Sequence, residues 1–180
     1  MIRSSTIRYA NEWLGSRAAL LGFAGAFAAE ARALSGVVRI ALLGSILTDK
    51  PSPKDIDLLV IVSESCDLAH LAVLARRMKG RAQSLGRGAD VFLGAEDGTY
   101  LGRVCAWRDC RPGVRKSCDA IHCGQRPFLH DDLHTVTLPT ELVREPPLEL
   151  IPHVLARRAL PADVTEWLIE LGGSSLSGPE

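Results

Sequence analysis

Two aspartates, Asp55 and Asp57, stand at the start of an apolar run that ends at Val62. Because side chains alternate between the two faces of a strand, both carboxylates leave one face while Ile56 points into the core. Carboxylates held a few ångströms apart repel each other unless a positive charge lies between them. A divalent metal supplies that charge, and ligands that are all oxygen favour Mg²⁺ or Mn²⁺ over zinc. The pair therefore predicts a metal site.

A glycine–serine pair, Gly44-Ser45, follows the preceding apolar run, Val37–Leu43. Glycine lets the backbone come close to a ligand, and serine after a strand can cap a short helix whose first amides attract phosphate. Carboxylates that bind metal beside a phosphate site are the groups that phosphoryl or nucleotidyl transfer requires. The alternative interpretation is an ordinary turn followed by a solvated strand start.

The segment Leu43-Gly44-Ser45, nine intervening residues and Asp55-Ile56-Asp57-Leu58 resembles the signature of the DNA polymerase β-type nucleotidyltransferase superfamily. The resemblance is to the small stand-alone nucleotidyltransferase domains of bacteria. It covers residues 37 to 93, about half of the chain. It implies a third carboxylate on a later strand, and Asp90 within Ala89–Leu93 fits that position.

From this resemblance we expect Asp55, Asp57 and Asp90 to be catalytic and to hold two Mg²⁺ or Mn²⁺ ions. Gly44 and Ser45 are expected to bind the phosphates of a nucleoside triphosphate. The acceptor hydroxyl is not readable from the sequence and could belong to a small molecule, an RNA or a protein. A phosphohydrolase that uses the same carboxylates is a weaker alternative.

The same superfamily includes small members that act as antitoxins beside a helical toxin partner. A non-catalytic, antitoxin-like or regulatory module with a toxin-type or homo-oligomeric partner is therefore the alternative function. The three carboxylates argue against it, since a purely structural domain has no chemical need for them.

Composition fits one cytoplasmic domain of 180 residues with 47% hydrophobic content. The 21 acidic and 21 basic residues cancel, so no bulk charge attracts nucleic acid. The five cysteines are scattered and odd in number, which indicates free thiols in a reducing compartment. Three arginines before the apolar run 18–29 could indicate a signal peptide, but Glu12 and the long polar lead favour a helix. That run is too short to span a membrane.

The pattern of elements predicts an α/β (α+β) fold with a mixed, mainly antiparallel sheet flanked by helices. The link between the first two strands is too short for a helical crossover, so we expect those strands to be antiparallel. Residues 1–145 are expected to form the nucleotidyltransferase-like domain, and residues 146–180 a C-terminal helical extension and tail. Helices are expected at Asn11–Leu34 (capped by Asn11), 66–84, Leu148–Ala159 and Ala162–Leu171, and further strands at Tyr100–Trp107, Ala120–Cys123 and Thr135–Leu138.

Several other groups have the chemistry to bind ligands. The Cys105–Cys123 cluster, with His122, suggests zinc, although its spacings match no paired Cys-x-x-Cys arrangement. The segment from His130 to His134 could bind a cation or be a solvated loop. Basic residues that could neutralise a triphosphate are Lys50, Lys54, Arg111, Arg115 and Lys116. Strand alternation aims Lys54 away from the aspartates beside it.

Overall fold

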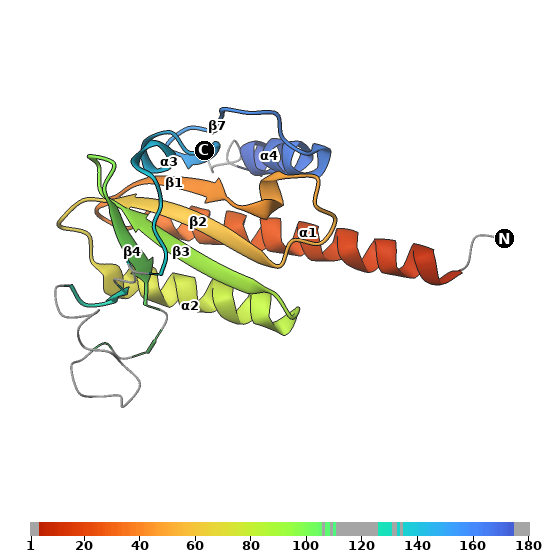
Figure 1. The fold of residues 1–180 in the computed structure, drawn as a ribbon, viewed down its shortest axis with the longest axis horizontal. Coiled ribbons are helices and arrows are strands. Elements are labelled where there is room, and N and C mark those ends of the chain that lie inside the picture. Colours follow the sequence, from red (N-terminus) through yellow and green to blue (C-terminus); the bar gives the residue numbers. More distant parts are fainter. Residues whose placement is uncertain are drawn as a thin grey trace, which may run out of the picture.

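The fold was obtained as a computed structural model, which describes residues 4–105, 107–108, 110, 126–130, 133 and 135–174, with side chains from residue 16 to 172. The chain forms an α+β fold with a seven-stranded mixed sheet in the order β5-β4-β3-β2-β1-β6-β7 (Figure 1). The strands are Val37–Leu43 (β1), Asp55–Val62 (β2), Gly88–Gly94 (β3), Tyr100–Val104 (β4), Leu129–His130 (β5), Leu148–Ile151 (β6) and Leu155–Ala156 (β7). The helices are Ser4–Ala31 (α1), the 3-10 turn Ser45–Leu47 (η1), Leu68–Ser84 (α2), Thr140–Arg144 (α3) and Ala162–Ser174 (α4).

The strand directions confirm a mixed, mainly antiparallel sheet. The first two strands form an antiparallel pair, with Leu43 opposite Asp57. Strands β2 and β3 are the parallel pair, connected through α2. All the other described pairs are antiparallel. The prediction that the short loop between β1 and β2 makes these strands antiparallel is therefore confirmed.

The main core lies between one face of the sheet and the helices α1 and α2, which pack against each other (Figure 1). Ile56, Leu58 and Val60 of β2 all point into this core and are completely buried. The opposite face carries a smaller core around Leu59 and Ile61, closed by Val143 of α3. Helix α3 covers only the far part of this face, so the beginning of β2 stays uncovered by it.

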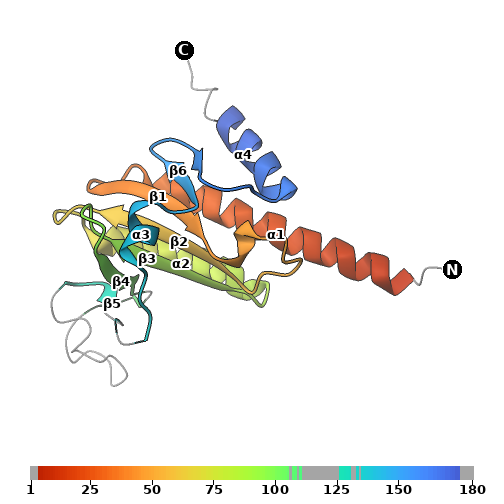
Figure 2. The same ribbon diagram turned by 45° about the horizontal axis from the view of Figure 1, so that its top comes forward.

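The C-terminal region belongs to the same sheet. Strand β6 pairs with β1, and α4 packs on α1 (Figure 2). Trp167 and Leu171 of α4 lie against Gly25, where a Cβ atom would be 3.3 Å from Leu171. Gly25 therefore gives α4 room to approach α1 closely.

The predicted helix at Leu148–Ala159 is wrong, since this segment contains β6 and β7. Leu148 and Leu150 both enter the main core with the period of two that a strand has. Pro152 supplies no amide hydrogen for a helix, while β6 satisfies the hydrogen-bonding edge of β1. Tertiary pairing thus overrides a local apolar pattern.

Three smaller expectations are corrected or limited. Asn11 does not cap a helix, because α1 begins at Ser4. The segment Thr135–Leu138 is not a strand. The predicted strand Ala120–Cys123 lies outside the described residues. Within the part of the chain that is described, no helix combines the length and apolarity needed to cross a membrane.

Candidate functional site

Asp55, Asp57 and Asp90 lie on one face of two neighbouring strands. The parallel register places Asp57 directly beside Asp90 and Asp55 beside Gly88. Asp55 and Asp57 are partly exposed, whereas Ile56 between them is completely buried, as strand alternation requires. The structure thus brings together three acidic side chains, one of them 33 residues away from its partner in the sequence.

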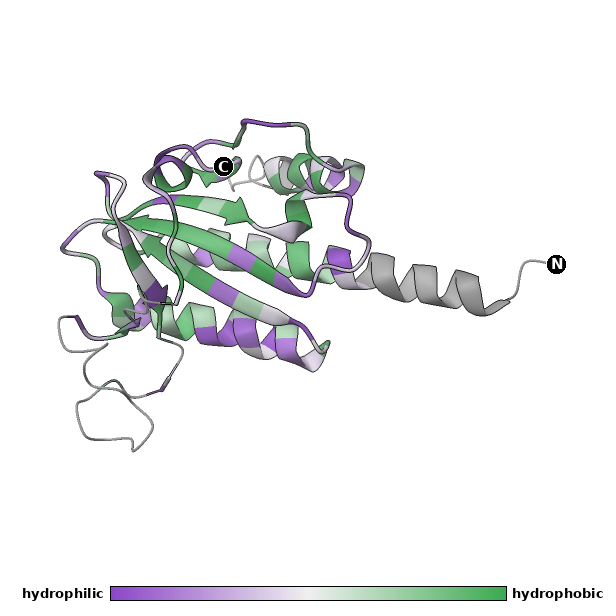
Figure 3. Ribbon diagram, viewed as in Figure 1, coloured by the Kyte–Doolittle hydropathy of each residue, from purple (hydrophilic) through white to green (hydrophobic). Residues whose placement is uncertain are grey.

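The hydrophobic surface of the sheet is interrupted at this point. Figure 3 shows polar breaks within the otherwise hydrophobic strands β2 and β3. Further along the same face, Leu59 and Ile61 are buried in the smaller core. The carboxylates therefore lie at the end of this face that α3 leaves uncovered.

The electrostatic cost of this arrangement falls on Asp57. Burial, together with the charges of Asp55 and Asp90, raises the pKa of Asp57 to about 7, while Arg103 opposes them. The raised value means that the protein around Asp57 does not supply enough positive charge to hold all three carboxylates ionised. A bound cation would supply the missing charge.

Two basic side chains flank Asp90. Lys79 reaches it from α2 and Arg103 from β4, each with a nitrogen 3.5 Å from Asp90 Oδ1. Asp90 keeps 35% of its side chain exposed. The contacts are therefore long ion pairs that leave one side of the carboxylate open to solvent.

Gly44 lies against Asp57 at the end of β1. Its φ of 78° is in the region that favours glycine. A side chain at this position would occupy the space of the Asp57 carboxylate. Glycine is therefore required here both by its backbone conformation and by the close approach to Asp57.

Ser45 begins η1, a 3-10 turn of three residues. The expectation that Ser45 caps a helix is wrong, because Gly44 holds the cap position and no side chain makes a capping hydrogen bond. Ser45 Oγ is instead buried, and it has no hydrogen-bond partner among the described residues. A buried hydroxyl without a partner is costly, and a ligand oxygen would satisfy it.

Arg17 of α1 holds the loop that follows Ser45. Its guanidinium donates hydrogen bonds to the carbonyl oxygens of Ile46, Thr48 and Lys50, at 2.9, 3.3 and 2.8 Å. Asp163 of α4 pairs with Arg17 Nε at 2.6 Å, and the Arg17 side chain is only 6% exposed. Charged side chains are rarely this buried without a specific partner, so Arg17 is a positioning residue for the loop.

In the sequence, Arg17 is one of the three arginines that precede the apolar run 18–29. That position does not say which loop supplies the carbonyl oxygens.

The side chains gathered here that could bind a divalent metal are the carboxylates of Asp55, Asp57 and Asp90. Among the described residues, no group of three or more His, Cys, Asp or Glu side chains is arranged so that it alone could hold a metal ion. Magnesium is commonly held by one or two carboxylates together with substrate phosphates and water, so a closed protein cage is not required. Asp55 and Asp57, with Asp90 beside them, fit that kind of open site.

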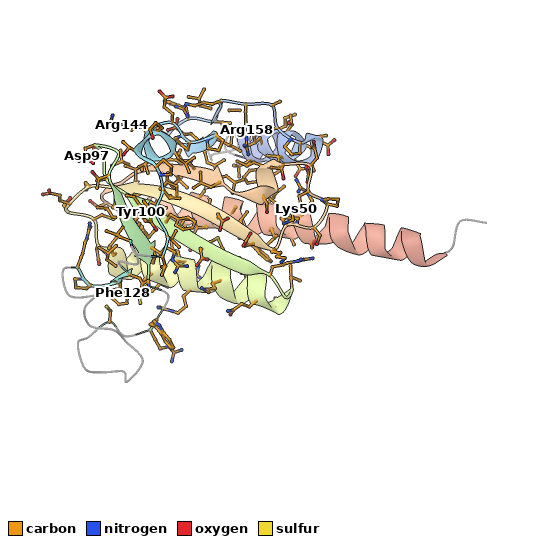
Figure 4. The ribbon with its side chains drawn as sticks, viewed as in Figure 1. Lys50, Asp97, Tyr100, Phe128, Arg144 and Arg158 are labelled. Carbon is orange, nitrogen blue, oxygen red and sulfur yellow. The ribbon has the colours of Figure 1, made fainter. Side chains whose placement is uncertain are left out.

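The other predicted ligands are not gathered here. Lys50 and Lys54 are exposed in the loop between η1 and β2, and Figure 4 shows Lys50 at the end of the sheet opposite Asp97 and Arg144. Cys105 is buried, and Cys110 Sγ accepts a hydrogen bond from the Phe128 amide at 3.1 Å. The remaining predicted ligands lie outside the described residues; they are Arg111, Arg115, Lys116, Cys118, His122, Cys123, Asp131, Asp132 and His134.

Comparisons with protein-family models, with curated proteins and with solved structures find no match to this chain. The functional assignment therefore depends on the geometry of the site and on the sequence pattern.

Proposed function

We propose that the protein is a metal-dependent nucleotidyltransferase with a sheet of the DNA polymerase β type. The observation that carries the proposal is the meeting of Asp55, Asp57 and Asp90 on one face, beside Gly44 and Ser45. Burial and two neighbouring carboxylates raise the pKa of Asp57, and the Ser45 hydroxyl has no partner among the described residues, so the site favours the binding of a cation together with an anion. A nucleoside triphosphate with Mg²⁺ or Mn²⁺ supplies both.

Each residue has a role that follows from its place. Ser45 Oγ and the backbone after Gly44 bind the triphosphate, and Arg17 holds that loop in position. Asp55 and Asp57 hold the metal, which when bound neutralises phosphate charge and aligns the reacting oxygens. Asp90, on the side away from Ser45, faces the acceptor hydroxyl and takes its proton.

The proposed reaction is a substitution at the α-phosphorus. The acceptor oxygen forms a new bond to phosphorus, and the bond between that phosphorus and the pyrophosphate oxygen breaks. Pyrophosphate leaves with the bonding electrons, and the hydroxyl proton passes to the Asp90 carboxylate. The product is an acceptor that carries a nucleoside monophosphate.

The test is incubation of the protein and Mg²⁺ with α-labelled nucleoside triphosphates and a cell extract. We expect a labelled acceptor with the unmodified protein and none with Asp57→Asn. Asp97→Asn is the matched control, because it removes a carboxylate at the other end of the sheet and keeps a side-chain acceptor for Thr99. Equal labelling by Asp57→Asn would contradict the assignment.

A non-catalytic interaction module is the second candidate. The ion pairs of Asp90 with Lys79 and Arg103 favour it, because they supply a structural reason for that carboxylate. Calorimetric titration with nucleoside triphosphates separates the two candidates. Binding that requires Mg²⁺ supports the transferase, whereas the absence of nucleotide binding supports a module whose partner is a toxin-type protein or a second copy of the chain.

A further inference from the structure

A pocket of about 540 Å³ opens beyond Asp90, between α2 and the end of β4. Its lining includes Arg76 and Lys79 from α2, Asp90 from β3, Arg103 from β4, and Trp107 and His130. Asp90 belongs both to this pocket and to the acidic cluster. The pocket therefore adjoins the candidate site at Asp90, the residue to which we assign the acceptor hydroxyl.

The pocket carries a positive charge although the whole chain is neutral. Among the described lining residues, Arg76, Lys79 and Arg103 contribute three cations, and Asp90 is the one carboxylate. Lys79 and Arg103 keep 39% and 29% of their side chains exposed. Both side chains therefore pair with Asp90 and still keep part of their surface exposed.

The rim of the pocket is fixed by a hydrogen bond from α2. Arg76 Nη1 donates to the Trp107 carbonyl oxygen at 2.7 Å, and the Trp107 side chain is 54% exposed. A half-exposed tryptophan beside cationic side chains offers an apolar surface to the organic part of an anionic ligand. The lining of the pocket is therefore complementary to an organic molecule that carries a phosphate group.

The order of the strands separates this pocket from the triphosphate site. Ser45 follows β1, Asp57 lies on β2, Asp90 lies on β3, and the pocket lies beyond β3. The carboxylates therefore lie between the Ser45 turn and the pocket. A triphosphate held at Ser45 would leave the pocket open for the second substrate.

We propose that this pocket binds a small phosphorylated acceptor, with its phosphate among Arg76, Lys79 and Arg103 and its hydroxyl directed to Asp90. This inference rests on the proposed transferase function. The volume is that of a small-molecule site, and the neutral net charge of the chain provides no bulk attraction for RNA. A small acceptor is thus favoured over a nucleic-acid strand.

The test uses ribose 5-phosphate as the probe and ribose as its uncharged control, titrated into the full chain in the presence of EDTA. We expect ribose 5-phosphate to bind and ribose not to bind. Lys79→Gln and Arg76→Gln should each weaken the binding about tenfold, because each removes a charged donor. Lys79→Arg should restore it.

Arg81→Gln is the matched control, since it removes the same charge from an exposed position of the same helix that does not line the pocket. Equal weakening by Arg81→Gln, equal binding of ribose, or no binding of ribose 5-phosphate would overturn the inference. An oligoribonucleotide that binds more than tenfold tighter than ribose 5-phosphate through Lys79 would overturn the small acceptor in favour of RNA.

A parallel titration with Mg²⁺ and ATP distinguishes the two proposals. Binding of Mg²⁺–ATP without binding of ribose 5-phosphate removes the acceptor pocket and leaves the transferase proposal intact. Binding of ribose 5-phosphate without Mg²⁺–ATP overturns both the transferase proposal and the acceptor role. The inference is supported if both probes bind at once, if Lys79→Gln weakens only the binding of ribose 5-phosphate, and if Ser45→Ala weakens only the binding of Mg²⁺–ATP.

Discussion

The carboxylate of Asp57 lies where burial and two neighbouring carboxylates all disfavour its charge. Its pKa is about 7 in the folded chain and 3.8 in a model peptide. Between these values the folded state binds more protons than the unfolded state, so the free energy of unfolding falls as the pH rises from about 4 to 7. Above pH 7 Asp57 is charged in both states, and the folded state then carries the full free-energy cost of that buried charge.

Asp57→Asn should therefore stabilise the metal-free protein at pH 8, by up to about 4 kcal/mol, and should change its stability little at pH 4. Urea unfolding in EDTA at the two pH values measures the difference. A variant that is less stable than the parent at pH 8 would show that the Asp57 charge is already compensated by the protein.

Mg²⁺ should raise the Tm of the parent protein at pH 8, because a ligand that binds only the folded state stabilises it by mass action. The same concentration of Mg²⁺ should leave the Tm of Asp57→Asn nearly unchanged. Thermal unfolding with Asp97→Asn as the control measures this, and it is independent of any enzyme assay. Equal shifts in all three proteins would place the Mg²⁺ effect elsewhere.

Ser45→Ala should leave the protein as stable as the parent or more stable by up to about 1 kcal/mol, since it removes a buried hydroxyl that lacks a partner. If that hydroxyl binds phosphate, the same variant should bind Mg²⁺–ATP about tenfold more weakly. Denaturation and calorimetry measure the two effects separately. A loss of stability together with unchanged nucleotide affinity would indicate a structural hydroxyl.

At the scale of elements, Arg17 connects three parts of the fold. It lies on α1, bonds to the loop after η1 and pairs with Asp163 on α4. The Arg17 guanidinium also lowers the pKa of Asp163 below its usual value. The stability from this pair is therefore present above pH 3.8 and is lost as the pH falls through the lowered pKa of the folded state.

Arg17→Met should destabilise the protein by about 3 kcal/mol, because three carbonyl oxygens lose their donor while the stem is replaced by a side chain of similar length. Asp163→Asn should cost only about 1 kcal/mol, since Arg17 keeps its carbonyl partners and Asp163 is partly exposed. Urea unfolding at pH 7 compares them. A larger cost for Asp163→Asn than for Arg17→Met would show that the ion pair with Asp163 contributes more to stability than the hydrogen bonds from Arg17 to the loop.

At the scale of the whole molecule, β6 and α4 complete the structure that the first half of the chain begins. Strand β6 pairs with β1 next to the candidate site, and Val164 of α4 is buried in the main core. Residues from both halves therefore share one core. A shared core of this kind favours cooperative unfolding.

We expect a single unfolding transition for the full chain. In a variant with Trp13→Phe and Trp107→Phe, the fluorescence of Trp167 reports on α4, while far-ultraviolet circular dichroism reports on all the helices and strands. The two signals should have the same midpoint in urea within error. An earlier Trp167 transition would show that α4 unfolds independently of the sheet.

Local patterns determined much of the first half of the fold. Apolar runs of strand length predicted β1, β2 and β3, and helical periodicity predicted α2 within two residues of its start. Strand alternation predicted that Asp55 and Asp57 share a face. These properties depend on neighbours a few residues apart, which is why they can be read from the sequence.

Tertiary structure decided the rest. The segment 148–159 has apolar residues that fit a helix, but the free edge of β1 makes Leu148–Ile151 a strand. Only the parallel register of β2 and β3 places Asp90 beside Asp57, and only packing of α1 and α4 brings Arg17 to the loop after Ser45. The sequence by itself thus determined which side chains could do chemistry and which face of a strand they leave. Their mutual distances were decided by strand pairing and core packing, because these join residues whose separation along the chain carries no information about their separation in space.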